Sequence, residues 1–88
     1  MPWTVYILEC VDNTLYTGIA RDLTARLKKH ANGTGAKYTR GRGPHKVVYT
    51  ELRRTKGAAL KREAAIKALD RPRKLKLVLS GPQAARSQ

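Results

Sequence analysis

The sequence predicts a small α/β domain of the α+β type, in which helices flank a three-stranded antiparallel sheet in the order β-β-α-β-α-α. Two segments near the N-terminus, VYILEC and LYTGIA, alternate in side-chain character like paired strands, and HKVVYTEL repeats this pattern later. Apolar residues at helical spacing follow the second and the third of these segments. The length of 88 residues suits one small domain with a limited core.

The first two strands form a hairpin whose register depends on the length of its loop. Tyr6 lies in the first strand and Tyr16 in the second. A two-residue turn would place the two tyrosines on opposite faces, whereas a three-residue loop ending at Asn13 pairs Tyr6 with Gly18 and puts both phenols on one face. We favour the three-residue loop, because asparagine tolerates the left-handed conformation that it requires. Tyrosine is also simply a good strand former, which is the plainer explanation of both residues.

The first helix begins after Asp22, which can cap it, and we expect it to span Leu23–Ala31. At about 100° per residue, Leu27 and His30 fall on one stripe and Arg26 falls on its border, so we expect Arg26 and His30 at the seam between core and solvent. By themselves, a histidine in such a place is a satisfied core residue and an arginine is a solvated charge. Their place after the two tyrosines makes both candidates for a functional site.

A loop rich in glycine and cations, GTGAKYTRGRGP, extends from Gly33 to Pro44. Glycines let backbone amides approach an anion closely, and Lys37, Arg40 and Arg42 supply positive charge. Tyr38 adds an aromatic ring that can stack on a base or a sugar. The loop therefore predicts a nucleic-acid contact, although a solvated loop with incidental charge would have the same composition.

The third strand is expected over His45–Leu52. In a regular strand, Val47, Tyr49 and Glu51 share one face, because side chains alternate with a period of two. The segment RRT then turns the chain towards the second helix.

Thr55 can cap this second helix, which we expect over Lys56–Leu69 because the segment is rich in alanine and long side chains. The predicted apolar arc consists of Ala58, Ala59, Ala65, Ile66 and Leu69. Glu63 lies just beside this arc. On an exposed face it would simply pair with Lys67 one turn later.

The C-terminal part begins with a helix break at DRP, and Pro72 suits the first turn of a last short helix. Leu75, Val78 and Leu79 would form its apolar face. The segment KLKLVL also alternates like a strand, so a strand remains the alternative. We expect a single domain over residues 1–80 and a flexible tail over residues 81–88.

The charge balance points to a polyanionic partner. The chain carries 19 Lys and Arg against 6 Asp and Glu, a net charge of +13. This favours a nucleic acid over an anionic membrane surface. DNA is the expected partner and RNA the alternative, as in a ribosome-associated basic protein. Outside the glycine-rich loop, the expected contacts are Arg21, Lys29, Arg73 and Lys74.

A single cysteine, Cys10, excludes an internal disulfide and a cysteine-based metal site. The sequence shows no basic segment followed by an apolar leader, and no apolar run of membrane length. We therefore expect a cytoplasmic protein that associates with the nucleoid in use. We expect a monomer with no membrane contact and no disulfide-linked partner.

Several short motifs occur in a defined order: Val5-Tyr6-Ile7, then Tyr16-Thr17-Gly18, then Arg26 and His30, then the basic loop, and finally Glu63. This arrangement resembles the GIY-YIG nuclease family over nearly the whole chain, and most closely its small stand-alone bacterial members. The first triplet is VYI where the family has GIY, and the second is YTG where it has YIG. Both triplets keep the tyrosine, and the second keeps the glycine.

The resemblance implies a structure-selective DNA endonuclease that hydrolyses phosphodiester bonds, in a setting such as DNA repair or recombination. It implies that Tyr6 is the general base, that Tyr16 and His30 assist it, and that Arg26 holds the scissile phosphate. Glu63 would bind one Mg²⁺ or Mn²⁺ ion, weakly without substrate, because one carboxylate needs phosphate and water to complete the site. Since a phenol has a pKa near 10, we expect nearby cations and hydrogen bonds to favour the Tyr6 phenolate.

One departure from the family pattern bears on activity. Many members carry an asparagine shortly after the glutamate, and here no asparagine follows Glu63. Arg73 and Lys74 lie near that position, so either a cation makes the phosphate contact or catalysis is weak. The alternative function is therefore a non-catalytic nucleic-acid-binding module on the same fold.

Overall fold

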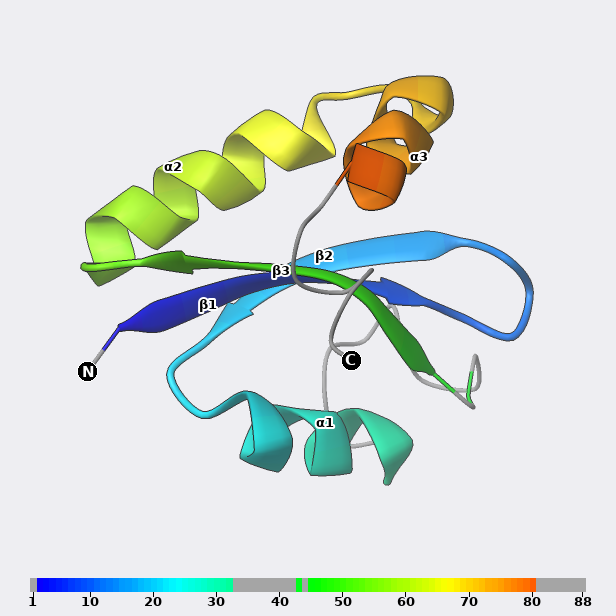
Figure 1. The fold of residues 1–88 in the computed structure, drawn as a ribbon. Coiled ribbons are helices and arrows are strands. Elements are labelled where there is room, and N and C mark those ends of the chain that lie inside the picture. Colours follow the sequence, from blue (N-terminus) through cyan, green and yellow to red (C-terminus); the bar gives the residue numbers. More distant parts are fainter. Residues whose placement is uncertain (1, 33–42, 44, 81–88) are drawn as a thin grey trace.

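The computed structural model describes residues 2–32, 43 and 45–80 (Figure 1). Its elements are β1 (Trp3–Glu9), β2 (Leu15–Ala20), α1 (Leu23–Ala31), β3 (Lys46–Arg53), α2 (Lys56–Lys67) and α3 (Arg71–Ser80). The three strands form one antiparallel sheet in the spatial order β2-β1-β3. Helix α1 covers one face of the sheet, and α2 and α3 cover the other. The predicted class and order of elements are confirmed, and KLKLVL is helical.

The hairpin has the three-residue loop that its sequence favours. Tyr6 pairs with Gly18, and Leu8 pairs with Tyr16. Asn13 in the loop has φ of 67°, within the left-handed region that asparagine adopts more readily than most residues. This register places both tyrosines on the face of the sheet that α1 covers.

The sheet separates two hydrophobic clusters. The cluster under α2 and α3 contains Val5, Ile7, Tyr49, Ala59 and Ile66. The cluster under α1 contains Tyr6, Leu8 and Ala20, with Tyr16, Leu23, Leu27 and Val47 packed against it. Central strand β1 contributes alternate side chains to both clusters and is buried from Val5 to Leu8. Burial on both faces therefore fixes the side to which Tyr6 points.

Strand β3 departs from regular alternation. Consecutive residues of β1 pair with Tyr49 and Val47, so Val48 is an extra residue in β3. As a result, Val47 packs under α1 while Tyr49 packs under α2. The prediction that Val47, Tyr49 and Glu51 share one face was wrong, because the irregularity shifts the alternation by one residue.

Both predicted N-caps are present. The Asp22 carboxylate accepts a hydrogen bond of 3.1 Å from the backbone N–H of Ala25 at the start of α1. The Thr55 hydroxyl accepts one of 3.1 Å from the backbone N–H of Ala58 at the start of α2. The caps fix where both helices leave the sheet, although α2 ends at Lys67, earlier than predicted.

The predicted apolar faces of the last two helices were only partly right. In α3, Val78 packs against the cluster as expected and Leu77 does so too, whereas Leu75 is 38% exposed and Leu79 is 83% exposed. In α2, Ala65 is exposed. The sequence LKLVL offers overlapping apolar stripes, and packing against the sheet selects one of them. Residues 81–88 lie outside the described residues, so the predicted tail and domain boundary stay predictions.

Glu51 connects β3 to α2. Its carboxylate is buried and accepts hydrogen bonds from the Tyr49 hydroxyl and, at 2.7 Å, from Nε of Arg62. Nη2 of Arg53 lies 2.6 Å from the same carboxylate. Arg62 directly precedes Glu63, so this connection restricts how α2 can rotate over the sheet.

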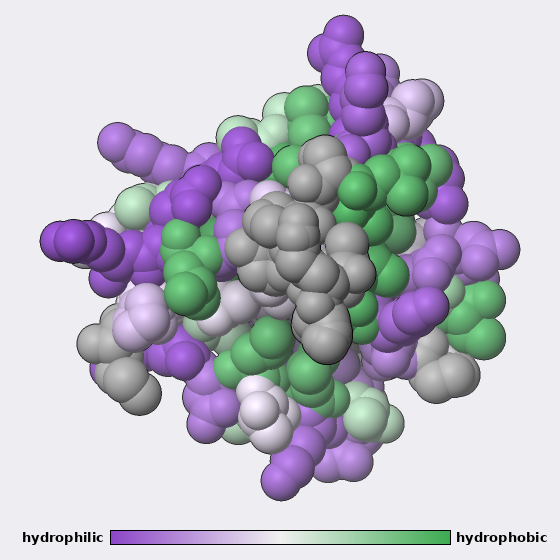
Figure 2. Space-filling view, in the orientation of Figure 1, coloured by the Kyte–Doolittle hydropathy of each residue, from purple (hydrophilic) through white to green (hydrophobic). Residues whose placement is uncertain are grey.

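The surface carries its charge on many sides. On the face shown in Figure 2, hydrophilic side chains project on several sides of the molecule, with hydrophobic ones between them. A net charge of +13 therefore does not by itself single out one binding surface. Within the part of the chain that the structure describes, no helix has the length and apolar character needed to span a membrane.

Candidate active site

Tyr6 and His30 form the buried centre of the candidate site. The phenol oxygen of Tyr6 lies 2.9 Å from Nε2 of His30, within hydrogen-bonding distance. The two residues are only 1% and 2% exposed. Strand β1 positions Tyr6, and the last turn of α1 positions His30 on the apolar stripe of that helix. Either atom can donate the hydrogen, depending on the tautomer of His30.

Tyr16 packs beside this pair. Its ring centroid lies 6.4 Å from that of Tyr6 and 5.5 Å from that of His30. Gly18 leaves the space that the rings occupy: a Cβ atom there would lie 2.7 Å from the phenol oxygen of Tyr6 and 3.1 Å from a ring carbon of Tyr16. The glycine of the second triplet is therefore a steric requirement of the two tyrosines.

Thr17 replaces the isoleucine of the YIG triplet and points to the other face of the sheet. It is buried, and its hydroxyl has no hydrogen-bond partner among the described residues. The substitution therefore leaves the site itself unchanged and places a polar atom under α2.

Tyr6 is held as a neutral phenol. Burial raises the pKa of Tyr6 well above its ordinary value, Tyr16 and Glu63 add to the rise, and Arg26 opposes it. The expectation that the surroundings favour the phenolate was wrong, because the charge of Arg26 does not offset the loss of hydration. For Tyr6 to act as a base, another group must therefore accept the proton of its phenol.

His30 is suited to accept that proton. Burial lowers the pKa of His30, and the neighbouring His45 and Arg26 lower it further, so the imidazole is neutral at neutral pH. The ring centroids of His30 and His45 are 5.8 Å apart. His45 was not among the predicted site residues. It is the only other histidine in the sequence, but its approach to His30 depends on the path of the chain into β3.

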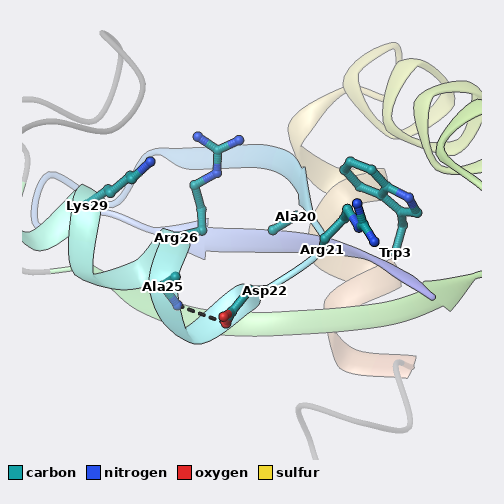
Figure 3. Close-up of a pocket in the computed structure, with 7 residues that line it drawn as sticks. All are labelled: Trp3, Ala20, Arg21, Asp22, Ala25, Arg26 and Lys29. Atoms are coloured by element: carbon teal, nitrogen blue, oxygen red, sulfur yellow. Dashed lines mark hydrogen bonds between the residues drawn. The ribbon is translucent and has the colours of Figure 1, made fainter. Parts of the chain in front are cut away.

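Arg26 lies where the buried centre meets solvent. Its side chain is exposed, and its guanidinium forms no ion pair with any residue that the structure describes. It lines a pocket of about 270 Å³ together with two other predicted contacts, Arg21 and Lys29 (Figure 3). A cation next to the Tyr6–His30 pair is thus available to bind an anion.

Glu63 approaches from α2, on the other side of the sheet. Its side chain is 18% exposed, and its carboxylate lies 3.4 Å from Nζ of Lys67, so the one-turn ion pair is formed. The same Lys67 ammonium lies 6.0 Å from the ring centroid of Tyr16. A side chain of α2 therefore reaches Tyr16 on the edge strand β2.

A divalent ion is implied by the family that the sequence resembles, and Glu63 is the residue expected to bind it. No group of three or more His, Cys, Asp and Glu side chains gathers in residues 2–32 and 45–80. A lone carboxylate still suits Mg²⁺, which often binds through one or two carboxylates plus substrate phosphates. Glu63 therefore fits such an ion only if substrate phosphates and water would complete the site.

The remaining predicted nucleic-acid contacts fall into two groups. Arg73 and Lys74 lie on α3, on the opposite side of the sheet from α1. The loop residues Lys37, Tyr38, Arg40 and Arg42 lie outside the described residues. Arg21, Arg26 and Lys29 are thus the predicted basic contacts that the structure gathers in one pocket.

Comparisons with known proteins agree on one family. Residues 2–76 match the GIY-YIG catalytic domain. A UPF0213 protein of Staphylococcus saprophyticus is 52% identical over 77 residues, which cover 88% of this chain and 94% of that protein. A UPF0213 protein of Staphylococcus epidermidis is 53% identical over the same length, with the same coverage.

Two solved structures show the same fold. The solution NMR structure of a UPF0213 protein from Bacillus halodurans has 49% identity and a TM-score of 0.60, covering 96% of this chain and 92% of that one. The NMR structure of a protein from E. faecalis has 36% identity and a TM-score of 0.61, covering 88% and 83%. The chain therefore belongs to the GIY-YIG nuclease family and is similar to its small UPF0213 members.

Proposed function

We propose that this protein is a structure-selective DNA endonuclease acting in DNA repair or recombination. In this proposal Tyr6 is the general base and one divalent ion, Mg²⁺ or Mn²⁺, binds at Glu63. The observation that carries it is the buried hydrogen bond between Tyr6 and His30, with Arg26 at the solvent side. A buried phenol and imidazole, beside a cation that forms no ion pair with the described residues, suit proton transfer next to a phosphate.

Tyr6 would act through a proton relay. With the hydrogen of His30 on Nδ1, the phenol donates its hydrogen bond to Nε2. The phenol oxygen then takes a proton from the attacking water while its own proton passes to Nε2, so no free phenolate forms. The added negative charge on the phosphate stabilises the imidazolium that results. Tyr16, packed against both residues, would position the water.

Arg26 would bind the scissile phosphate. Its planar guanidinium can contact two phosphate oxygens at once and offset the charge that develops there. A divalent ion at Glu63 would supply charge stabilisation at the leaving oxygen. Lys67 holds the Glu63 carboxylate in place until that ion and the DNA are bound.

A non-catalytic nucleic-acid-binding module is the second candidate. The missing asparagine after Glu63 and the lone carboxylate favour it. A cleavage assay separates the two: purified protein is incubated with single-stranded, flap, junction and duplex DNA in Mg²⁺, Mn²⁺ or a chelator. An endonuclease yields products that require the ion and disappear in Glu63→Ala. Binding without cleavage on every substrate would favour the module.

A further inference from the structure

The pocket beside α1 contains an aromatic residue that the proposed mechanism does not use. Trp3 lies at one end of the pocket next to Arg21, Lys29 lies at the other end, and Arg26 lies between them (Figure 3). The small side chains of Ala20 and Ala25 leave the hollow that the charged residues surround. A volume of about 270 Å³ lies just below the range typical of ligand pockets, which is about 300–1,000 Å³. The pocket therefore suits a single base or a sugar.

Positive charge gathers around the indole ring of Trp3. The guanidinium carbon of Arg21 lies 5.9 Å from its centroid, and Nζ of Lys56 in α2 lies 5.6 Å from it. The one carboxylate in the pocket lining, that of Asp22, accepts a hydrogen bond from the backbone of α1. An aromatic ring among cations is the combination by which proteins bind single-stranded nucleic acids.

Packing against the core explains only in part why a tryptophan stands at position 3. The side chain is half-buried and rests against the cluster under α2, a role that an aliphatic residue could fill. Trp3 also lines the pocket, where a flat ring would offer a stacking surface that an aliphatic residue lacks. Arg26 lines the same pocket, so a nucleotide stacked there would lie close to the phosphate that Arg26 binds.

We propose that this pocket is a subsite for one unpaired nucleotide beside the scissile phosphate, whose base stacks on Trp3 and whose flanking phosphates contact Arg21 and Lys29. The inference rests on the proposed function, because it takes Arg26 as the ligand of the scissile phosphate. A paired base is stacked within the duplex and cannot reach the indole. The subsite therefore selects DNA with unpaired nucleotides next to the cut, as in a flap or a single strand.

Trp3 is the single tryptophan of the chain, so its fluorescence reports on this pocket alone. Flap DNA is titrated into the wild-type protein in a chelator, with tryptophan fluorescence and the anisotropy of labelled DNA followed together. We expect quenching that saturates with binding. An abasic site moved along the strand should abolish the quenching at one position, within about two nucleotides of the cut. Binding that leaves the fluorescence unchanged would overturn the subsite and leave the endonuclease proposal intact.

Two variants test the role of the ring. Trp3→Leu keeps the apolar bulk and should weaken flap binding by about 5- to 150-fold, the value of stacking one base. Trp3→Tyr restores a stacking ring and should restore most of the affinity, while all three proteins bind paired duplex equally. Equal losses on flap and duplex, or no rescue by tyrosine, would contradict the subsite.

Other outcomes of these experiments separate the subsite from the endonuclease proposal. If Trp3→Leu does not fold, the abasic scan on the wild-type protein decides alone. If quenching maps to one nucleotide but no DNA is cleaved in Mg²⁺ or Mn²⁺, the subsite stands as a binding site and the endonuclease proposal fails. A flap that does not bind at all overturns the subsite.

Discussion

Among single residues, His30 decides the pH range in which Tyr6 can act. The relay needs a neutral imidazole, and burial, His45 and Arg26 lower the pKa of His30 below its ordinary value. The cleavage rate should therefore fall on the acid side with an apparent pKa below about 6.5. Above that pKa the rate should stay level to about pH 9, because the raised pKa of Tyr6 excludes a phenolate.

Single-turnover rates with subsaturating DNA, measured across pH at constant ionic strength, report the pKa values of the free enzyme and give this profile. A rate that instead rises tenfold per pH unit through the alkaline range would show that the phenolate is the base. An acid limb centred at or above the ordinary histidine pKa would remove His30 from the relay.

The close contact between Gly18 and Tyr6 allows a second prediction for a single residue. In Gly18→Ala the new methyl group would meet the phenol oxygen of Tyr6 at 2.7 Å and must displace the ring. We expect cleavage to fall by about 10²-fold, the effect of misplacing a catalytic group by about 1 Å. Thermal unfolding should also show a loss of about 1–3 kcal/mol from overpacking.

Gly57→Ala is the matched control, since a Cβ atom there would meet nothing within 4 Å. It should leave cleavage unchanged and stabilise α2 slightly. Equal behaviour of the two variants would show that the close approach at Gly18 is unimportant.

Among the elements, the connection between β3 and α2 depends on one carboxylate. Burial alone raises the pKa of Glu51, but hydrogen bonds from Arg62 and Tyr49 outweigh it, so the pKa lies below its ordinary value. A lowered pKa means that this stability is present above the pKa of the unfolded chain and is lost as the pH falls through the folded value. Glu51→Gln should therefore destabilise the protein by about 1–3 kcal/mol at pH 7, and by less at about pH 3.

Urea denaturation at the two pH values measures this difference. Glu9→Gln is the control, because Glu9 forms no ion pair with the described residues. A larger destabilisation by Glu51→Gln at the lower pH than at pH 7 would contradict the predicted direction of this pH dependence.

Some features of the strands and helices could be predicted from the sequence, and others could not. The hairpin register and both N-caps follow from a few neighbouring residues, which is why Tyr6 and Tyr16 were placed correctly on one face. The irregularity in β3 and the buried stripe of α3 depend on contacts between segments far apart in the chain. Local patterns do not specify such contacts, so the predicted faces of Val47 and Leu79 were wrong.

The same distinction holds for the candidate site. The helical stripe correctly grouped His30 with Leu27, but the prediction that His30 lies at the seam between core and solvent was wrong, because the side chain is buried against the tyrosines. Its contact with His45, the approach of Lys67 to Tyr16 and the neutral state of Tyr6 were not predicted. These features arise from tertiary packing and from burial, which a single sequence does not display.

At the scale of the whole molecule, the net charge of +13 should make DNA binding strongly salt-dependent. Each phosphate neutralised contributes about −0.9 to the slope of log K against log salt on duplex DNA. Lys29→Ala should therefore reduce the slope by about 0.9, because Lys29 lines the pocket beside Arg26. The slope comes from affinities measured over a range of salt concentrations.

Lys61→Ala is the control for Lys29→Ala, because it also removes one positive charge. Lys61 lies on the side of α2 that faces away from Glu63. Its slope should stay closer to that of the wild type. Identical slopes for the two variants would place the DNA elsewhere on the surface.

The central claim is that Tyr6 transfers a proton, and Tyr6→Phe tests it by removing only the phenolic oxygen. Single-turnover cleavage in Mg²⁺ should fall by about 10²–10⁴-fold, while DNA affinity stays within about twofold. Stability should drop by about 0.5–1.5 kcal/mol, because His30 loses its hydrogen bond.

Tyr49→Phe is the matched control: it removes the same atom from a buried tyrosine under α2, away from the site. We predict that Tyr49→Phe cleaves DNA at close to the wild-type rate while Tyr6→Phe loses cleavage. A Tyr6→Phe protein that binds and cleaves DNA like the wild type would contradict the assigned mechanism.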